Sequence, residues 1–91
     1  MNKQEIQDWL EQNDSLIYDI TESLIAKRDE ELKTNPMFKD EIYSQFNDQL
    51  LNDVADEFTR ENLLPEEDFY GIISPKVVVS FCLGVYNANS K

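Results

Sequence analysis

The chain has 91 residues, of which 41% are hydrophobic and 11% are aromatic. This length allows one domain with a modest core, and the aromatic content is too high for a disordered chain. Nineteen Asp and Glu residues against eight Lys and Arg residues give a net charge of −11. Such a charge repels phosphate backbones and argues against direct binding of nucleic acid, whereas a basic protein partner remains compatible with it.

Cys82 is the only cysteine, and the chain has no histidine. An internal disulfide is therefore impossible, and the usual ligand sets for zinc are missing. The N-terminal residues are polar and soon acidic, unlike a signal peptide, and the longest apolar stretch is shorter than the about 18 residues of a membrane span. We expect a cytoplasmic protein that does not enter a membrane.

The first predicted element is a helix over residues 3–33, which contain neither Pro nor Gly. At about 100° per residue, seven apolar side chains fall in one sector: Ile6, Trp9, Leu10, Leu16, Ile17, Ile20 and Leu24. Residues 13–15, Asn-Asp-Ser, prefer caps and turns, but the apolar phase is the same before and after them. One long helix with a kink near Asn13 is the first interpretation, and two shorter helices are the alternative.

The far side of this helix is acidic, with carboxylates at Glu5, Asp8, Glu11, Asp19, Glu22, Asp29 and Glu30. In one straight helix they would extend over about 37 Å, at about 1.5 Å per residue. That is one charge per about 5 Å, sparser than the about 3.4 Å between phosphates along one DNA strand. The predicted partner-binding residues are Asp8, Glu11, Asp19, Glu22, Asp29 and Glu30.

The second predicted helix covers residues 36–63. Asn35 and Pro36 suit an N-cap and a first helical position. Apolar residues then recur at every fourth position, which forms a packing ridge: Phe38, Ile42, Phe46, Leu50, Val54 and Phe58. After Pro65 a short turn of helix is expected, in which residues 66–68, Glu-Glu-Asp, form a solvated first turn at the positive helix end.

The last predicted helix covers residues 75–87. Ser74 and Pro75 are helix-start signals, and although the three valines at 77–79 favour strands, no other segment alternates with period two to pair with them. Apolar residues surround this helix almost completely, which is typical of a buried helix. The predicted fold is therefore all-α and single-domain, a small bundle of two long amphipathic helices around a short apolar C-terminal helix.

The predicted core comprises Trp9, Ile17, Ile20, Leu24, Phe46, Leu50, Val78, Phe81 and Val85. Two longer helices offer one apolar stripe each, so part of the C-terminal helix, such as Val77, Leu83 or Tyr86, is expected to remain uncovered. Exposed apolar patches usually mark an interface, which predicts a homodimer. Ser80 and Gly84 lie one turn apart, where a neighbouring backbone could approach closely.

The sequence offers no pattern typical of catalysis. It has no histidine base and no Gly-rich phosphate loop, and Cys82 on an apolar helix face is interpreted as a buried hydrophobic residue. We therefore predict a non-enzymatic protein without cofactor or metal. An enzyme that works through carboxylates and a metal is a third hypothesis without a motif in its favour.

The first functional hypothesis is a small acidic protein that docks on a basic surface of a partner protein. Such a protein could inhibit or regulate a nucleic-acid-handling protein, as a DNA mimic does. The alternative is a structural or assembly subunit that associates through its apolar C-terminal helix, with the acidic surface serving only solubility. Under the first hypothesis, aromatic side chains outside the core are the alternative anchors: Tyr43, Phe58, Phe69 and Tyr70.

Overall fold

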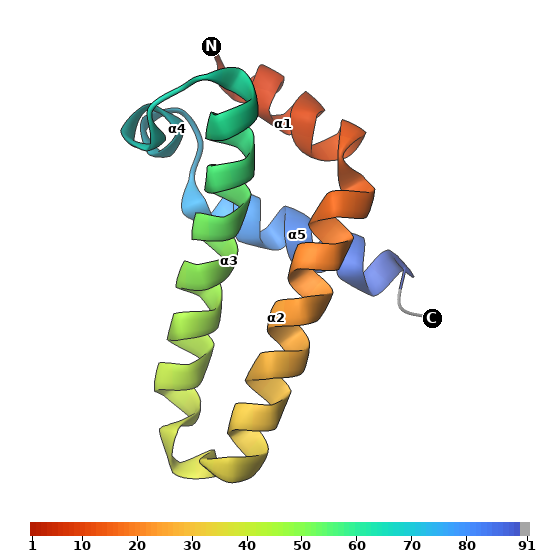
Figure 1. Cartoon of the computed structure of the whole chain (residues 1–91), viewed down its shortest axis with the longest axis vertical. Coiled ribbons are helices and arrows are strands. Elements are labelled where there is room, and N and C mark those ends of the chain that lie inside the picture. Colours follow the sequence, from red (N-terminus) through yellow and green to blue (C-terminus); the bar gives the residue numbers. More distant parts are fainter. Residues whose placement is uncertain (90–91) are drawn as a thin grey trace.

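The computed structural model describes residues 1–89, and all its regular elements are helices (Figure 1). The elements are α1 (Lys3–Gln12), α2 (Asp14–Thr34), the 3₁₀ helix η1 (Pro36–Phe38), α3 (Lys39–Asn62), α4 (Glu66–Ile72) and α5 (Pro75–Asn89). The all-α prediction is confirmed. The expected short helix after Pro65 is α4, and the last helix begins at Pro75 as expected and continues two residues beyond 87.

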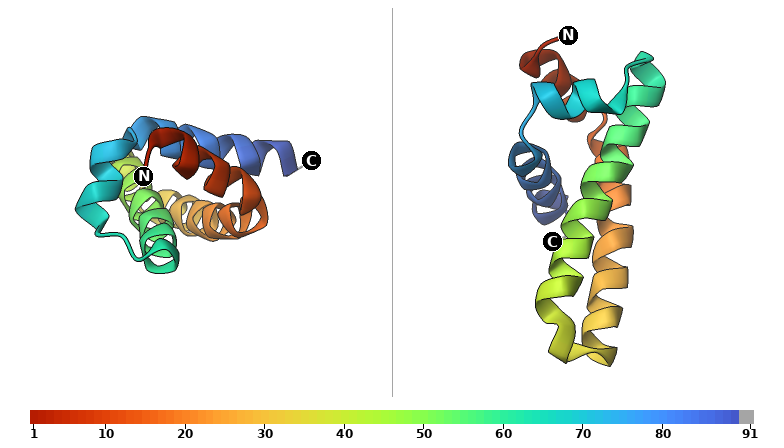
Figure 2. Two further views of the ribbon diagram at one scale, coloured as in Figure 1. Left: turned by 90° about the horizontal axis from the view of Figure 1, so that it is seen from above. Right: turned by 90° about the vertical axis from the view of Figure 1, so that its left-hand side faces the viewer.

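Helices α2 and α3 form a long antiparallel hairpin closed by η1 at one end (Figure 1). Helix α5 crosses one side of this hairpin, and α1 and α4 cover its other end (Figure 2). The principal extents are 41 × 29 × 19 Å. The two long helices therefore pack on the C-terminal helix as predicted, but from one side only, so that α5 keeps a face of its own toward solvent.

The region 3–33 contains two helices, so the first interpretation of one long helix is wrong and the alternative is correct. The chain leaves the helical conformation at Asn13, with φ −114° and ψ 32°, and changes direction there (Figure 1). The Asn13 side-chain amide donates to the Trp9 carbonyl oxygen at 2.8 Å, beside the backbone bond from the Asn13 N–H to the same oxygen at 3.0 Å. A short amide side chain that competes in this way for the backbone ends the helix.

The second predicted helix is also divided, because η1 precedes α3. Asn35 was expected to cap it, but its side chain makes no capping hydrogen bond, and only its backbone oxygen accepts from the Phe38 N–H at 3.0 Å. Phe38, the first residue of the predicted ridge, is 53% exposed at the tip of the hairpin. The remaining ridge residues are buried as predicted: Ile42, Phe46, Leu50, Val54 and Phe58.

The core lies where α1, α4 and α5 meet the hairpin. Of the nine predicted core residues, five are buried: Trp9, Ile17, Phe46, Leu50 and Val78. The other four are only partly buried: Ile20, Leu24, Phe81 and Val85. The prediction was wrong for these four because α5 covers one side of the hairpin. Leu24 borders a groove on the uncovered side, and α5 itself has no second layer above it.

Helix α3 ends at Leu63, which has φ 53° and ψ 43° in the left-handed region. The backbone N–H groups of Leu63 and Leu64 both donate to the Thr59 carbonyl oxygen, as in a C-terminal cap of this kind. Glycine normally occupies this position, since a Cβ atom is strained there. The Leu63 side chain is 91% exposed and repays little of this cost by packing.

Replacing Leu63 by Gly should therefore raise the free energy of unfolding by about 0.5–1 kcal/mol, the relief of strain less the extra backbone entropy of glycine in the unfolded chain. Urea denaturation measures this change. Leu63→Ala is the matched control, because it removes the same side chain but retains the strain, and it should change stability little. Equal effects of the two substitutions would mean that the exposed side chain, and not the backbone, determines the result.

Candidate partner-binding surface

The six predicted binding acids are all exposed, but the break at Asn13 separates them into two groups. Asp8 and Glu11 lie on α1, which runs at an angle to α2 (Figure 1). The other four lie on α2: Asp19, Glu22, Asp29 and Glu30. The continuous straight stripe of about 37 Å therefore does not form, because its length assumed one uninterrupted helix.

The four α2 acids are exposed, whereas Ile17, Thr21 and Ile25 form the buried side of this helix. Two of them already interact within the chain. Asp29 accepts from the Arg28 guanidinium at 3.3 Å, and hydrogen bonding to Glu22, together with partial desolvation, raises the pKa of Tyr18. This surface is thus less purely negative than its carboxylate count indicates.

A denser concentration of charge lies in residues 53–68, at the C-terminal end of α3 and the start of α4. We call it the acidic corner; it contains seven carboxylates, Asp53, Asp56, Glu57, Glu61, Glu66, Glu67 and Asp68. Arg60 is the only basic residue in this range, which leaves a net charge of −6 out of −11 for the chain. Five of the seven acids are exposed, and Asp53 and Glu57 are half-buried.

The neutralisation inside the acidic corner is small. Arg60 pairs with Glu57, and this ion pair and the Arg28–Asp29 pair are the two salt bridges found within residues 1–89. Asp53 accepts only a neutral amide donor, Gln49 Nε2, at 2.7 Å. Of the other five acids, Asp56 and Glu66 lie against each other, and no ion pair within residues 1–89 involves Glu61, Glu67 or Asp68.

Two carboxyl groups of the acidic corner lie against each other across the α3–α4 junction. Hydrogen bonding with Asp56 and the negative charge of Asp56 raise the pKa of Glu66. Nearby, the Tyr70 hydroxyl donates to Asn52 Oδ1 at 2.9 Å, which fixes α4 on α3. Burial and the same two carboxylates raise the pKa of Tyr70. The fold thus holds the carboxyl groups of Asp56 and Glu66 close together, whereas in an unfolded chain they would move apart.

This pair makes stability depend on pH. Because the pKa of Glu66 is raised in the folded state, the folded state binds the proton more tightly, and stability falls as pH rises above the ordinary pKa of 4.5. Glu66→Gln removes this titration. As pH rises from about 4 to about 7, we therefore expect the unchanged protein to lose stability relative to the variant. Thermal denaturation at several pH values measures this, with Glu67→Gln as the control. A parallel dependence for both variants would contradict the coupling to Asp56.

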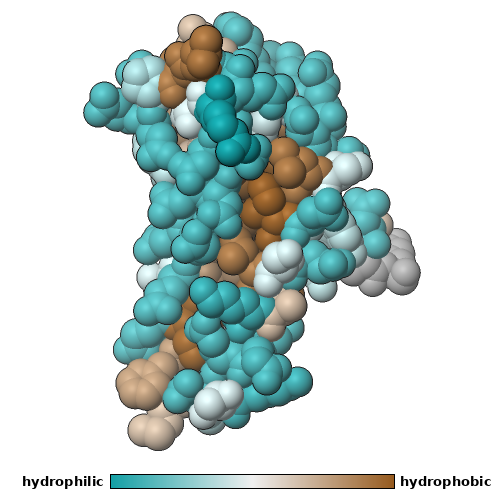
Figure 3. All heavy atoms as spheres, in the orientation of Figure 1, coloured by the Kyte–Doolittle hydropathy of each residue, from teal (hydrophilic) through white to brown (hydrophobic). Residues whose placement is uncertain are grey.

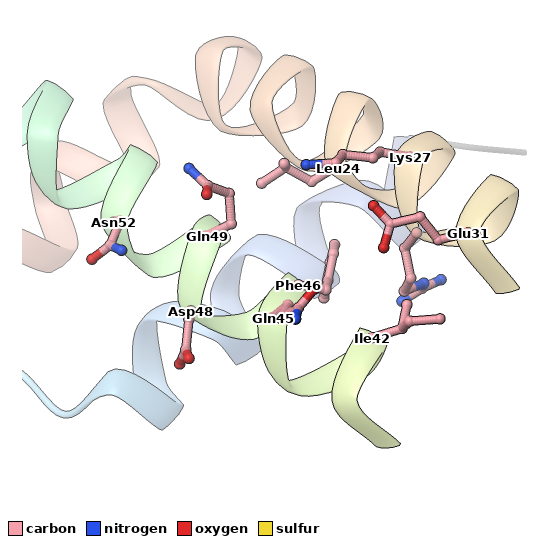
Figure 4. Close-up of a pocket in the computed structure, with 10 residues that line it drawn as sticks. Leu24, Lys27, Glu31, Ile42, Gln45, Phe46, Asp48, Gln49 and Asn52 are labelled. Carbon is pink, nitrogen blue, oxygen red and sulfur yellow. The ribbon is translucent and has the colours of Figure 1, made fainter. Parts of the chain in front are cut away.

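A groove of about 280 Å³ lies between α2 and α3, on the side of the hairpin where Figure 3 shows apolar side chains in the gap between these helices. Leu24, Ile42 and Phe46 supply its apolar lining. Around them lie polar side chains, most of which Figure 4 labels: Lys27, Arg28, Glu31, Gln45, Asp48, Gln49 and Asn52. The groove carries mixed charge, so it does not continue the negative surface.

Arg28 is already engaged inside this groove. Its guanidinium lies 4.9 Å from the centre of the Tyr43 ring and 4.8 Å from that of Phe46, within the range of cation–π attraction. The same guanidinium contacts Asp29. These contacts connect α2 to α3 in the half of the hairpin nearer to η1. Because the Arg28 guanidinium already contacts two rings and a carboxylate, it is poorly placed to bind an external anion.

The predicted aromatic anchors fall into two classes. Tyr43 is 38% exposed and Tyr70 is half-buried, so both reach the surface. Phe58 and Phe69 are 1% and 0% exposed, and the prediction that they lie outside the core is wrong. Helix α4 folds back against α3, which brings the Phe69 ring to 5.3 Å from that of Phe58 and buries both.

Cys82 is buried, as predicted, and burial raises the pKa of its thiol to about 11. Within residues 1–89, no three His, Cys, Asp or Glu side chains are grouped so that they could hold a metal ion. In the same range no single helix has the length and apolarity to cross a membrane; α4 and α5 would meet that test only together, and they are bent by 87° at their junction.

Helical periodicity does not reveal the acidic corner, because its acids belong to two different helices. A running net charge along the sequence does reveal it, since seven acids fall within residues 53–68. No protein-family model, curated protein sequence or solved structure gives a significant match to this chain, so the candidate surface is defined by geometry and charge.

Proposed function

We propose that this protein is a non-enzymatic interaction protein that docks on a basic surface of a partner protein through its acidic corner. The observation that carries the proposal is the net charge of −6 in residues 53–68, with one internal ion pair. A concentrated field of one sign attracts a complementary basic surface and increases the rate of association. The acids of α1 and α2 supply a second contact region with a lower density of negative charge.

The contact between Asp56 and Glu66 supports this choice. The hydrogen bond with Asp56, followed by the negative charge of Asp56, raises the pKa of Glu66, so that loss of the shared proton leaves two like charges side by side in the free protein. A Lys or Arg side chain of a partner placed beside the pair would remove the repulsion and add charge-assisted hydrogen bonds. Binding of a basic surface is thus favoured because it relieves the repulsion between Asp56 and Glu66 that the fold imposes.

A nucleic-acid-handling protein is the partner class that we propose, because its binding cleft presents clustered Lys and Arg residues to a negative backbone. An acidic protein of this size could occupy such a cleft and so inhibit or regulate its owner. The alternative function, an assembly subunit in which the acids serve only solubility, predicts that partners do not respond to salt.

The test is affinity capture from lysate with the tagged chain as bait, followed by a stepwise increase in salt. Partners held by exposed charges should elute between about 0.1 and 0.5 M salt, because screening shortens the range of the field to a few ångströms. We expect this fraction to be rich in DNA- or RNA-processing proteins. Partners that stay bound at high salt and have no basic surface would contradict the proposal and support the assembly alternative.

A further inference from the structure

The tip of the α2–α3 hairpin carries large apolar side chains that the rest of the described chain leaves exposed. Five large hydrophobic residues are exposed within residues 1–89, and three of them lie between positions 37 and 43. They are Met37, which is 88% exposed, Phe38 and Tyr43. Exposed apolar residues scattered singly need no explanation, whereas a group of them at the end of a protruding hairpin indicates a contact surface (Figure 1).

A recess of about 430 Å³ opens beside Phe38. We call it the tip recess; its lining residues are Glu31, Asn35, Phe38, Glu41, Ile42 and Gln45. Three of them also line the groove between α2 and α3, and Figure 4 labels all three: Glu31, Ile42 and Gln45. The tip recess therefore continues this groove toward the exposed residues of the hairpin tip.

The tip recess differs in charge from the groove that it continues. The groove contains two basic side chains, whereas two carboxylates and no basic side chain line the recess. Glu31 is half-buried and Glu41 is exposed, and neither takes part in an ion pair within residues 1–89. Lys33 and Lys39 are close in sequence but do not line the recess. The recess is therefore complementary to a cation.

A basic side chain is the cation that fits these groups. Phe38 and Ile42 offer an apolar surface to a hydrocarbon stem, and the carboxylates of Glu31 and Glu41 attract the charged head group. Arginine suits the recess better than lysine. Its planar guanidinium stacks on an aromatic ring and donates several hydrogen bonds at once, whereas a lysine ammonium is a compact and strongly hydrated charge.

The contacts of Arg28 show the same chemistry within the chain. The Arg28 guanidinium lies 4.9 Å from the centre of the Tyr43 ring and 4.8 Å from that of Phe46, and it pairs with Asp29. Arg28 does not line the tip recess, so it leaves the recess free. A second arginine, supplied by a partner, would meet the same kinds of group there, an aromatic ring and carboxylates.

We infer that the tip recess is a docking site for an arginine side chain of a partner protein, with Met37 and Phe38 in contact with apolar residues beside that arginine. The site takes a short segment in which a basic residue has apolar neighbours, and not a uniformly basic surface. This inference does not rest on docking through the acidic corner. The two surfaces share no residue, and they lie at opposite ends of the hairpin (Figure 1).

The probe is an alanine-based helical peptide with one arginine and a leucine one turn to each side of it. Fluorescence anisotropy of the labelled peptide should give a dissociation constant of about 0.1 mM, because the contact is much smaller than a stable interface. Citrulline in place of arginine keeps the shape but removes the charge, and it should weaken binding about tenfold. Equal affinities, or no binding of the arginine peptide at about 1 mM protein, would overturn the inference.

Glu41→Lys tests the carboxylate of the recess. This substitution should weaken binding of the arginine peptide about tenfold and strengthen binding of a peptide with glutamate in place of arginine. Asp40→Lys is the matched control, since Asp40 is exposed and does not line the recess. It makes the same change of charge in the same helical turn and should change the affinity less than about threefold. Far-UV circular dichroism checks that both variants fold.

Equal effects of the two substitutions would mean that only the overall field attracts the peptide, and the inference would fail. Amide chemical shifts of isotope-labelled protein then locate the contact, and we expect the peptide to change them at residues 35–45. Changes centred on residues 53–68 would overturn the inference while supporting docking at the acidic corner. Flotation with phosphatidylglycerol vesicles that Phe38→Ala abolishes would assign the tip to a lipid surface and also overturn it.

Discussion

Replacing Phe58 by Ala should lower the free energy of unfolding by about 3–5 kcal/mol, the largest effect that we expect from a single substitution. Phe58 is 1% exposed, and its ring lies 5.2 Å from that of Trp9 and 5.3 Å from that of Phe69. It therefore joins α3 to both α1 and α4. Removal of the Phe58 ring leaves a cavity between the rings of Trp9 on α1 and Phe69 on α4, which the surrounding helices close only partially.

Phe38→Ala is the matched control for this prediction. Phe38 belongs to the same predicted ridge, but it is 53% exposed at the tip of the hairpin. Its replacement should cost less than about 1 kcal/mol. Chemical denaturation followed by circular dichroism measures both values. Similar losses for the two variants would contradict the placement of the centre of the core at the junction of α1, α3 and α4.

Neutralising the acidic corner should weaken partner binding about tenfold to a thousandfold, the second large effect that we expect. The variant carries Asp56→Asn, Glu66→Gln, Glu67→Gln and Asp68→Asn. Exposed ion pairs contribute about 0–1 kcal/mol each, so four of them together account for this range and none is decisive alone. Titration against the partner eluted by salt, at two salt concentrations, gives the change and its salt dependence.

A variant with the same change of charge controls for the overall field. It carries Asp8→Asn, Glu11→Gln, Asp19→Asn and Glu22→Gln on α1 and α2. If docking is centred on the acidic corner, this second variant should lose clearly less affinity than the first. The reverse order would move the centre of docking to α1 and α2. Equal, small losses in both would remove local acidic contacts from the mechanism and favour Tyr43 or Tyr70 as anchors.

Some of the site could be read from the sequence and some of it could not. The exposure of the α1 and α2 acids follows from the helical period, which places them opposite the apolar side chains. The break at Asn13 does not follow from it, because two helices with the same apolar phase give the same pattern as one. What ends α1 is a hydrogen bond from the Asn13 side chain to Trp9, which depends on local conformation.

The acidic corner shows the same division. The seven carboxylates of residues 53–68 are visible in the sequence. Their mutual effect is not, because Asp56 and Glu66 are ten positions apart on different helices. They meet only because Leu63 takes the left-handed conformation and lets α4 turn back on α3. The burial of Phe58 and Phe69 follows from that same turn.

The sequence by itself determined the helical class, the starts of the last two helices at Pro65–Glu66 and Pro75, and the buried side of α3. Each of these depends on interactions between residues at most a few positions apart, which periodicity and proline geometry specify. Only the tertiary structure decided that α5 is covered on one side and which carboxylates approach each other. These features depend on the directions in which the helices leave their turns. A few backbone dihedral angles set those directions, and the composition of the chain does not encode them.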